Sequence, residues 1–60
     1  MTVTIAYGDN QTMTFTNVLD VSVNKMSIFV AYKDGAKSMT ASVDIKAIGT
    51  YTLTVVPASN

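Results

Sequence analysis

Polar and apolar residues alternate with a period of two along most of the chain, which is the pattern of β-strands with one buried face. Val3, Ile5 and Tyr7 alternate with small or polar residues and predict a first strand. The same alternation predicts further strands at residues 12–16, 21–23, 39–45 and 51–55. No stretch has the spacing of a helix longer than a single turn. The sequence therefore predicts an all-β protein.

The segment MSIFVAY at residues 26–32 departs from this alternation because it is apolar on both faces. Such a strand is typical of the centre of a sheet that is covered on two sides. Turn formers separate the predicted strands. The sequence GDNQ at residues 8–11 predicts one turn, and Asp34-Gly35 is the strongest hairpin signal in the chain. Pro57, which has no amide hydrogen to donate, ends the last predicted strand.

Two halves of the chain, about residues 2–23 and 27–56, share a pattern. The sequence IAYGD at residues 5–9 aligns with VAYKD at residues 30–34. Each half would form strand, turn, strand, kink and strand, and neither could bury its apolar face alone. We therefore expect a single domain over residues 1–60, in which five or six short antiparallel strands form a small barrel or sandwich from two hairpin-based half-repeats.

A pair of apolar residues three positions apart occurs once in each half. Val18 and Val21 in the first half match Ile45 and Ile48 in the second half. This spacing suits one helical or kinked turn that points both side chains into the core. Asp44 is positioned to cap the second of these turns through its carboxylate.

The composition narrows the function classes. The chain has 60 residues, a formal net charge of zero and 48% hydrophobic residues. It is too apolar to be disordered, and its neutrality argues against nucleic-acid binding through bulk electrostatics. No apolar run is long enough to span a bilayer, and the first residues lack the features of a signal peptide. We therefore expect a cytoplasmic protein without membrane contacts.

Candidate catalytic chemistry is sparse. The sequence contains no histidine and no cysteine, so general-base catalysis near neutral pH would fall to a strongly perturbed, buried aspartate or lysine. Each aspartate and lysine instead lies beside a turn signal or in a polar position. The serines have no base to activate them, and no acidic residues alternate as in a calcium loop. We expect no enzymatic activity, no metal site and no cofactor.

Tyr7 and Tyr32 occupy equivalent positions before the turns of the two halves. Each can bury its ring at the rim of the core and leave its hydroxyl in water. A pair of exposed rings could instead stack nucleic-acid bases, but that mode also needs a basic groove, and the lysines are few and scattered. If the protein binds a ligand, we expect the contacts at Tyr7, Tyr32, Lys33 and Asp34, near the two equivalent turns.

Threonine recurs at every second position in residues 2–4, 12–16 and 50–54. Such rows resemble the ice-binding faces of some antifreeze proteins, but those solenoids have a strict short period that this chain lacks. We interpret the threonines as the solvent-facing side of amphipathic strands.

Two features favour self-association. A strand that needs cover on both faces is difficult to bury in a chain of this size, and the sequence also supplies adaptable apolar side chains at Met13, Met26 and Met39. An open six-stranded arrangement would leave edges that pair with another copy. A symmetric homo-oligomer would bury those edges.

The segments YGD, FTNV, VSV and VAYKDG lie at residues 7–9, 15–18, 21–23 and 30–35. In this order they resemble short all-β proteins that are encoded by phages and prophages of Gram-positive bacteria. The resemblance covers most of the chain and is one of overall pattern. It implies a small phage accessory protein that binds and inhibits a host or defence component, in the cytoplasm of the host cell. Some counter-defence proteins of this size sequester a nucleotide signal between subunits.

These observations favour a non-catalytic interaction module that self-associates and binds a protein partner. Two alternatives stay open. The first is an oligomer that sequesters a small, nucleotide-like ligand between its subunits. The second is a structural or decoration component of a larger particle. A binder of single-stranded nucleic acid is the least favoured function.

Overall fold

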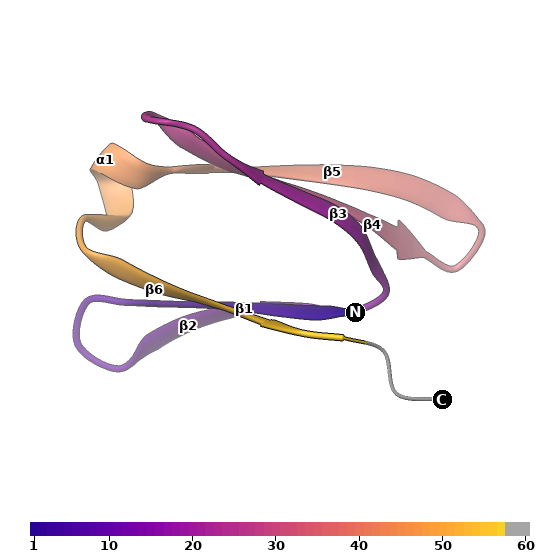
Figure 1. Ribbon diagram of the computed structural model, residues 1–60, viewed down its shortest axis with the longest axis horizontal. Coiled ribbons are helices and arrows are strands. Elements are labelled where there is room, and N and C mark those ends of the chain that lie inside the picture. Colours follow the sequence, from indigo (N-terminus) through magenta and orange to yellow (C-terminus); the bar gives the residue numbers. More distant parts are fainter. Residues whose placement is uncertain (58–60) are drawn as a thin grey trace.

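The computed structural model describes residues 1–57, so the end of the predicted domain, residues 58–60, lies outside the described residues. Over these described residues the protein is all-β, with two three-stranded antiparallel sheets and one short helix. The elements are β1 (Thr2–Tyr7), β2 (Gln11–Phe15), β3 (Val18–Val23), β4 (Ser27–Asp34), β5 (Lys37–Asp44), α1 (Ile45–Ile48) and β6 (Tyr51–Val56). The sheets face each other as the two layers of a sandwich (Figure 1).

Each sheet combines strands from both halves of the chain. Sheet A has the strand order β2-β1-β6, and sheet B has the order β3-β4-β5. The hairpin of each half therefore takes its third strand from the other half. This exchange explains how two halves that cannot bury their own apolar faces form one core.

Each half contains a backbone hydrogen bond at an equivalent position. The amide of Val18, at the start of β3, donates to the carbonyl oxygen of Met1 over 2.9 Å. The amide of Ile45, at the start of α1, donates to the carbonyl oxygen of Met26 over 3.0 Å. In each half, the first residue of the element after the hairpin is thus hydrogen-bonded to the residue just before the first strand of that hairpin.

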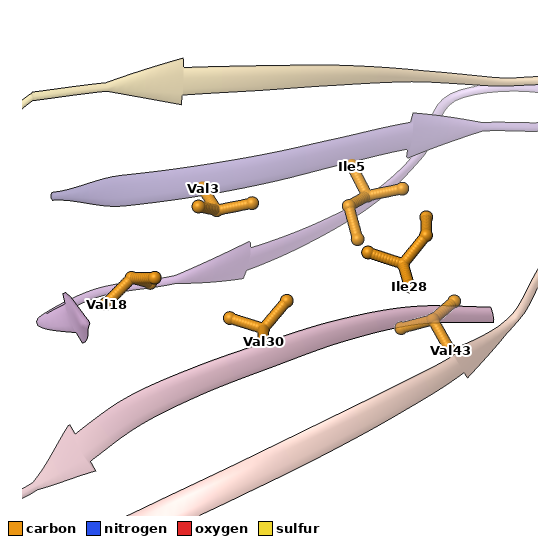
Figure 2. Packing of buried hydrophobic residues seen from close by; sticks show 6 residues of the cluster. All are labelled: Val3, Ile5, Val18, Ile28, Val30 and Val43. Carbon is orange, nitrogen blue, oxygen red and sulfur yellow. The ribbon is translucent and has the colours of Figure 1, made fainter. Parts of the chain in front are cut away.

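The core lies between the sheets and is made of aliphatic side chains that alternate along their strands. The buried residues come from β1, β3, β4 and β5 and point toward one another (Figure 2). They are Val3, Ile5, Val18, Ile28, Val30 and Val43. Half-buried residues surround them, among them Tyr7, Tyr32 and Tyr51, whose rings pack against this cluster.

The strand β4 lies at the centre of sheet B, as MSIFVAY predicts, but it is covered on one face only. Ile28 and Val30 are fully buried, whereas Phe29 points to the opposite face and is 39% exposed. The register places Phe29 between Ser22 and Ser42. Within one copy of the chain, the described residues therefore cover β4 on one face only, because the two layers leave each sheet one outer face.

The predicted turns that follow the two hairpins differ in form. In the second half, Ile45 and Ile48 lie on α1 and pack against the core, and the Asp44 carboxylate accepts a hydrogen bond from the Lys46 amide over 3.0 Å. The predicted cap is therefore confirmed. In the first half, β3 begins at Val18, earlier than predicted, and an irregularity in its pairing takes the place of a helical turn.

The β4–β5 hairpin turns through Gly35 and Ala36, one position later than the Asp34-Gly35 signal indicates. Asp34 pairs with Lys37 across the end of the hairpin. Gly35 has a φ of 62°, and glycine takes this left-handed conformation without steric cost. Asn17, which precedes β3, has a φ of 55°, a value that asparagine tolerates better than most residues.

Candidate functional site

The two ends of the sandwich differ in the segments that connect the sheets there. At one end, α1 joins β5 to β6 (Figure 1), and Ile45 and Ile48 pack against the core there. At the other end, Thr16 and Asn17 form the short connection from β2 of sheet A to β3 of sheet B. A cleft of about 340 Å³ lies at this second end.

The cleft is formed by two segments that are distant in the sequence. Its lining residues are Thr14, Phe15, Thr16, Asn17, Tyr32, Lys33, Asp34 and Gly35. The Phe15 and Tyr32 rings lie 5.6 Å apart between centroids and are tilted by 48°. Because Phe15 belongs to sheet A and Tyr32 to sheet B, this aromatic pair joins the two layers and gives the cleft an apolar wall.

Polar groups line the rest of the cleft. The Lys33 amide donates a hydrogen bond to the carbonyl oxygen of Asn17 over 3.0 Å, which holds the β2–β3 connection against β4. The side chains of Lys33 and Asp34 are both exposed. One cleft therefore offers an aromatic surface, a positive charge and a negative charge to an occupant.

The structure separates the four residues that the sequence suggests for ligand contacts. Tyr32, Lys33 and Asp34 line the cleft together. Tyr7 pairs with Gln11 and Tyr51 at the far end of β1, on the side of the sandwich where α1 lies (Figure 1). The alignment of Tyr7 with Tyr32 in the sequence thus does not predict how close they lie in the fold.

Sequence reasoning missed the contribution of residues 14–17 to the cleft. Phe15 follows the strand alternation and gives no separate signal of a role at the cleft. Asn17 does give one, because an asparagine directly before the apolar Val18 marks a break between two strands. The shortness of that break is what brings Phe15 and Tyr32 to the same end of the sandwich.

The outer face of sheet A is a second distinctive surface. It presents rows of small, uncharged side chains that the register aligns across β2, β1 and β6. These rows are Thr14–Thr4–Thr54 and Thr12–Ala6–Thr52. The three strands contain no aspartate and no lysine, and Asp9 in the β1–β2 turn is the nearest charged residue along the chain. The other charged residues belong to sheet B, its turns and α1.

Within residues 1–57, no group of three aspartates is close enough to hold a metal ion. In the same part of the chain, no helix has the length and apolarity needed to cross a membrane.

No protein-family model matches this sequence, and comparisons with curated proteins and with solved structures find no match either.

Proposed function

We propose that this protein is a non-catalytic interaction module that self-associates and binds a protein partner in the cleft between the two sheets. The observation that carries the proposal is the composition of that cleft. It combines the Phe15–Tyr32 pair with the exposed charges of Lys33 and Asp34. Aromatic surface beside polar groups is what protein-binding sites use, since the rings supply contact area and the polar groups fix orientation.

The distribution of charged side chains supports binding over catalysis. All aspartate and lysine side chains in the described residues are exposed, and the sequence contains no histidine or cysteine. Catalytic carboxylates and amines are typically buried or held by close partners, so exposed ones fit a binding surface better than an active site.

The volume of the cleft limits the size of the partner segment that can bind in it. A volume of about 340 Å³ suits one large side chain or a short turn of a partner. We expect that segment to place an aromatic or apolar side chain against Phe15 and Tyr32, with a polar group beside Lys33 or Asp34. The resemblance to phage accessory proteins indicates a host or defence protein as the partner.

The same volume supports a second candidate function. Pockets for small molecules start at about 300 Å³, and an aromatic wall can stack a planar ring such as a nucleobase. A small nucleotide-like ligand, with its ring on Tyr32 and its anionic group near Lys33, is the alternative occupant of the cleft.

Site-specific photo-crosslinking tests the proposal. The photoreactive residue p-benzoylphenylalanine replaces Thr16 at the cleft or, as the matched control, Thr40, an exposed threonine of β5. After irradiation in the cells that naturally encode the protein, we expect one discrete cross-linked protein from position 16 and none from position 40. Adding Lys33→Ala and Asp34→Ala, two surface substitutions, should remove that product.

Two results would reject a protein partner at the cleft. The first is equal cross-linking from positions 16 and 40, which would indicate non-specific contact. The second is no cross-linked protein combined with a small-molecule adduct in native mass spectrometry, which would favour the nucleotide-like ligand. Loss of the adduct on Lys33→Ala would then assign the ligand to this cleft.

A further inference from the structure

The edges of sheet B carry an irregularity or terminal charged residues, which disfavour pairing with another chain. The β3 edge is irregular between Val18 and Asp20, and Asp20 itself is exposed. The β5 edge begins at Lys37 and ends at Asp44. Bulges and charged residues are the devices by which natural sheets block edge-to-edge association.

The edges of sheet A lack these features. The sequences of β2 and β6 are QTMTF and YTLTVV, with no charged residue, no proline and no irregular pairing. Pro57 comes directly after β6 and leaves the strand itself free of proline. Within residues 1–57, β1 is the one strand that pairs with β6.

Of these two edge strands, β6 is longer and has more exposed apolar side chains that a partner strand could bury. It has six residues, whereas β2 has five. Val55 and Val56 are 43% and 54% exposed, whereas Met13 and Phe15, the large apolar residues of β2, are half-buried. A strand that is β-prone, uncharged and apolar at an open edge is the kind that recruits another strand.

The β6 strand of a second copy can pair with the free backbone N–H and C=O groups of this edge. In antiparallel pairing about a two-fold axis, residues opposite each other share one face of the sheet. Thr52 and Thr54 would then meet the threonines of the partner copy, and Leu53 and Val55 would meet its apolar residues on the inner face. Because β6 carries no charge, pairing it with itself sets no like charges against each other.

We propose that two copies of this protein associate by antiparallel pairing of their β6 strands, which joins the two A sheets into one continuous six-stranded sheet. Such a contact is isologous and closes after two subunits. The proposal rests on the self-association included in the proposed function and is independent of what binds in the cleft.

Hydrogen exchange on the unaltered protein is the first test. Sedimentation analysis gives the concentration at which the species has twice the monomer mass of 6.4 kDa. Between the monomer and this species, we expect the β6 amides that point away from β1 to exchange at least about tenfold more slowly, because each gains a hydrogen-bond partner. The edge amides of β2 should not change. Protection in β2 and not in β6 would overturn the proposal.

A matched pair of substitutions is the second test. Thr52 on β6 and Thr12 on β2 flank Ala6 in the same row of sheet A, and both are exposed. Thr52→Lys should raise the dissociation constant of the dimer at least about tenfold, because it puts a charge in each copy at the shared edge. Thr12→Lys should leave it unchanged. Equal effects of the two variants would overturn the proposal, and circular dichroism checks that both are folded.

The outcomes separate this proposal from the proposed function. A monomer at all accessible concentrations would reject self-association as a whole. A dimer that tolerates Thr52→Lys would reject the β6 interface and keep self-association. Cross-linking from position 16 reports on the cleft alone, so it can succeed or fail independently of the dimer.

Discussion

The rings of Phe15 and Tyr32 lie 5.6 Å apart and meet at 48°, an aromatic contact between sheet A and sheet B. It lies at the end of the sandwich where Thr16 and Asn17 alone connect β2 to β3. The contact therefore has two consequences. It holds the layers together at the end that α1 does not cover, and it forms a wall of the cleft.

The aromatic contact predicts energetic coupling between its two residues. In a double-mutant cycle of Phe15→Leu and Tyr32→Leu, we expect a coupling free energy of about 0.5–1.5 kcal/mol, the usual value for tilted aromatic pairs. Urea unfolding of the four proteins measures it. A cycle of Phe29→Leu with Tyr32→Leu is the control, because Phe29 points to the outer face of sheet B. Equal coupling in both cycles would show that the Phe15–Tyr32 contact has no specific role.

The position of the core predicts that shortening a buried aliphatic side chain lowers the free energy of unfolding more than shortening an exposed one. Ile28 is fully buried, and Leu19 is 58% exposed. Ile28→Val should lower the free energy of unfolding by about 0.5–1.5 kcal/mol, because it removes a buried methylene group. Leu19→Val also removes one methylene group and should change the free energy by less than about 0.5 kcal/mol. Both are measured by urea unfolding, and similar losses from the two would argue against a core between the sheets.

The β4–β5 turn predicts a conformational cost at Gly35. No atom lies within 4 Å of a Cβ added there, so any cost comes from the left-handed φ of 62° and not from a clash. Gly35→Ala should lower the free energy of unfolding by roughly 1–2 kcal/mol, and Gly35→Asn should lower it by less. Thermal unfolding followed by circular dichroism ranks the three proteins. An alanine variant as stable as the parent would contradict this turn geometry.

The hydrogen bond from the Lys46 amide to the Asp44 carboxylate predicts a capping contribution. Asp44→Ala should lower the free energy of unfolding by about 1 kcal/mol, and Asp44→Asn should restore most of it because the amide oxygen can still accept the bond. Asp9→Ala is the matched control, since Asp9 is an exposed turn residue for which no side-chain hydrogen bond is found in the described part of the chain. A loss from Asp9→Ala as large as that from Asp44→Ala would refute the cap.

Sequence reasoning located most of the local structure because each local signal depends on a few adjacent residues. The alternation of Val3 and Ile5 with threonines sets which face of β1 is buried, wherever that strand is placed. The spacing of Ile45 and Ile48 behind Asp44 likewise predicts one capped turn from neighbouring residues alone. The irregularity near Val18 could not be foreseen, since it depends on how β3 pairs with β4.

The candidate site, too, was predicted from the sequence only in part. Tyr32, Lys33 and Asp34 are consecutive, so their joint presence at the cleft follows from the chain itself. Tyr7 is equivalent to Tyr32 in the repeat, but β1 and β4 run in opposite directions in the sandwich (Figure 1). The ends of these two strands therefore lie at opposite ends of the molecule. Alignment of two residues in the sequence therefore does not predict their proximity, which depends here on the opposite directions of the two strands.

By itself, the sequence determined that this chain forms an all-β protein, which face of most strands is buried and where several of the turns lie. The tertiary structure alone decided that each hairpin takes its third strand from the other half, that Phe29 faces outward, and that Phe15 meets Tyr32. The physical reason is range: side-chain alternation and turn chemistry act between neighbours, whereas strand order depends on pairings between residues far apart in the chain, such as Val3 with Val55.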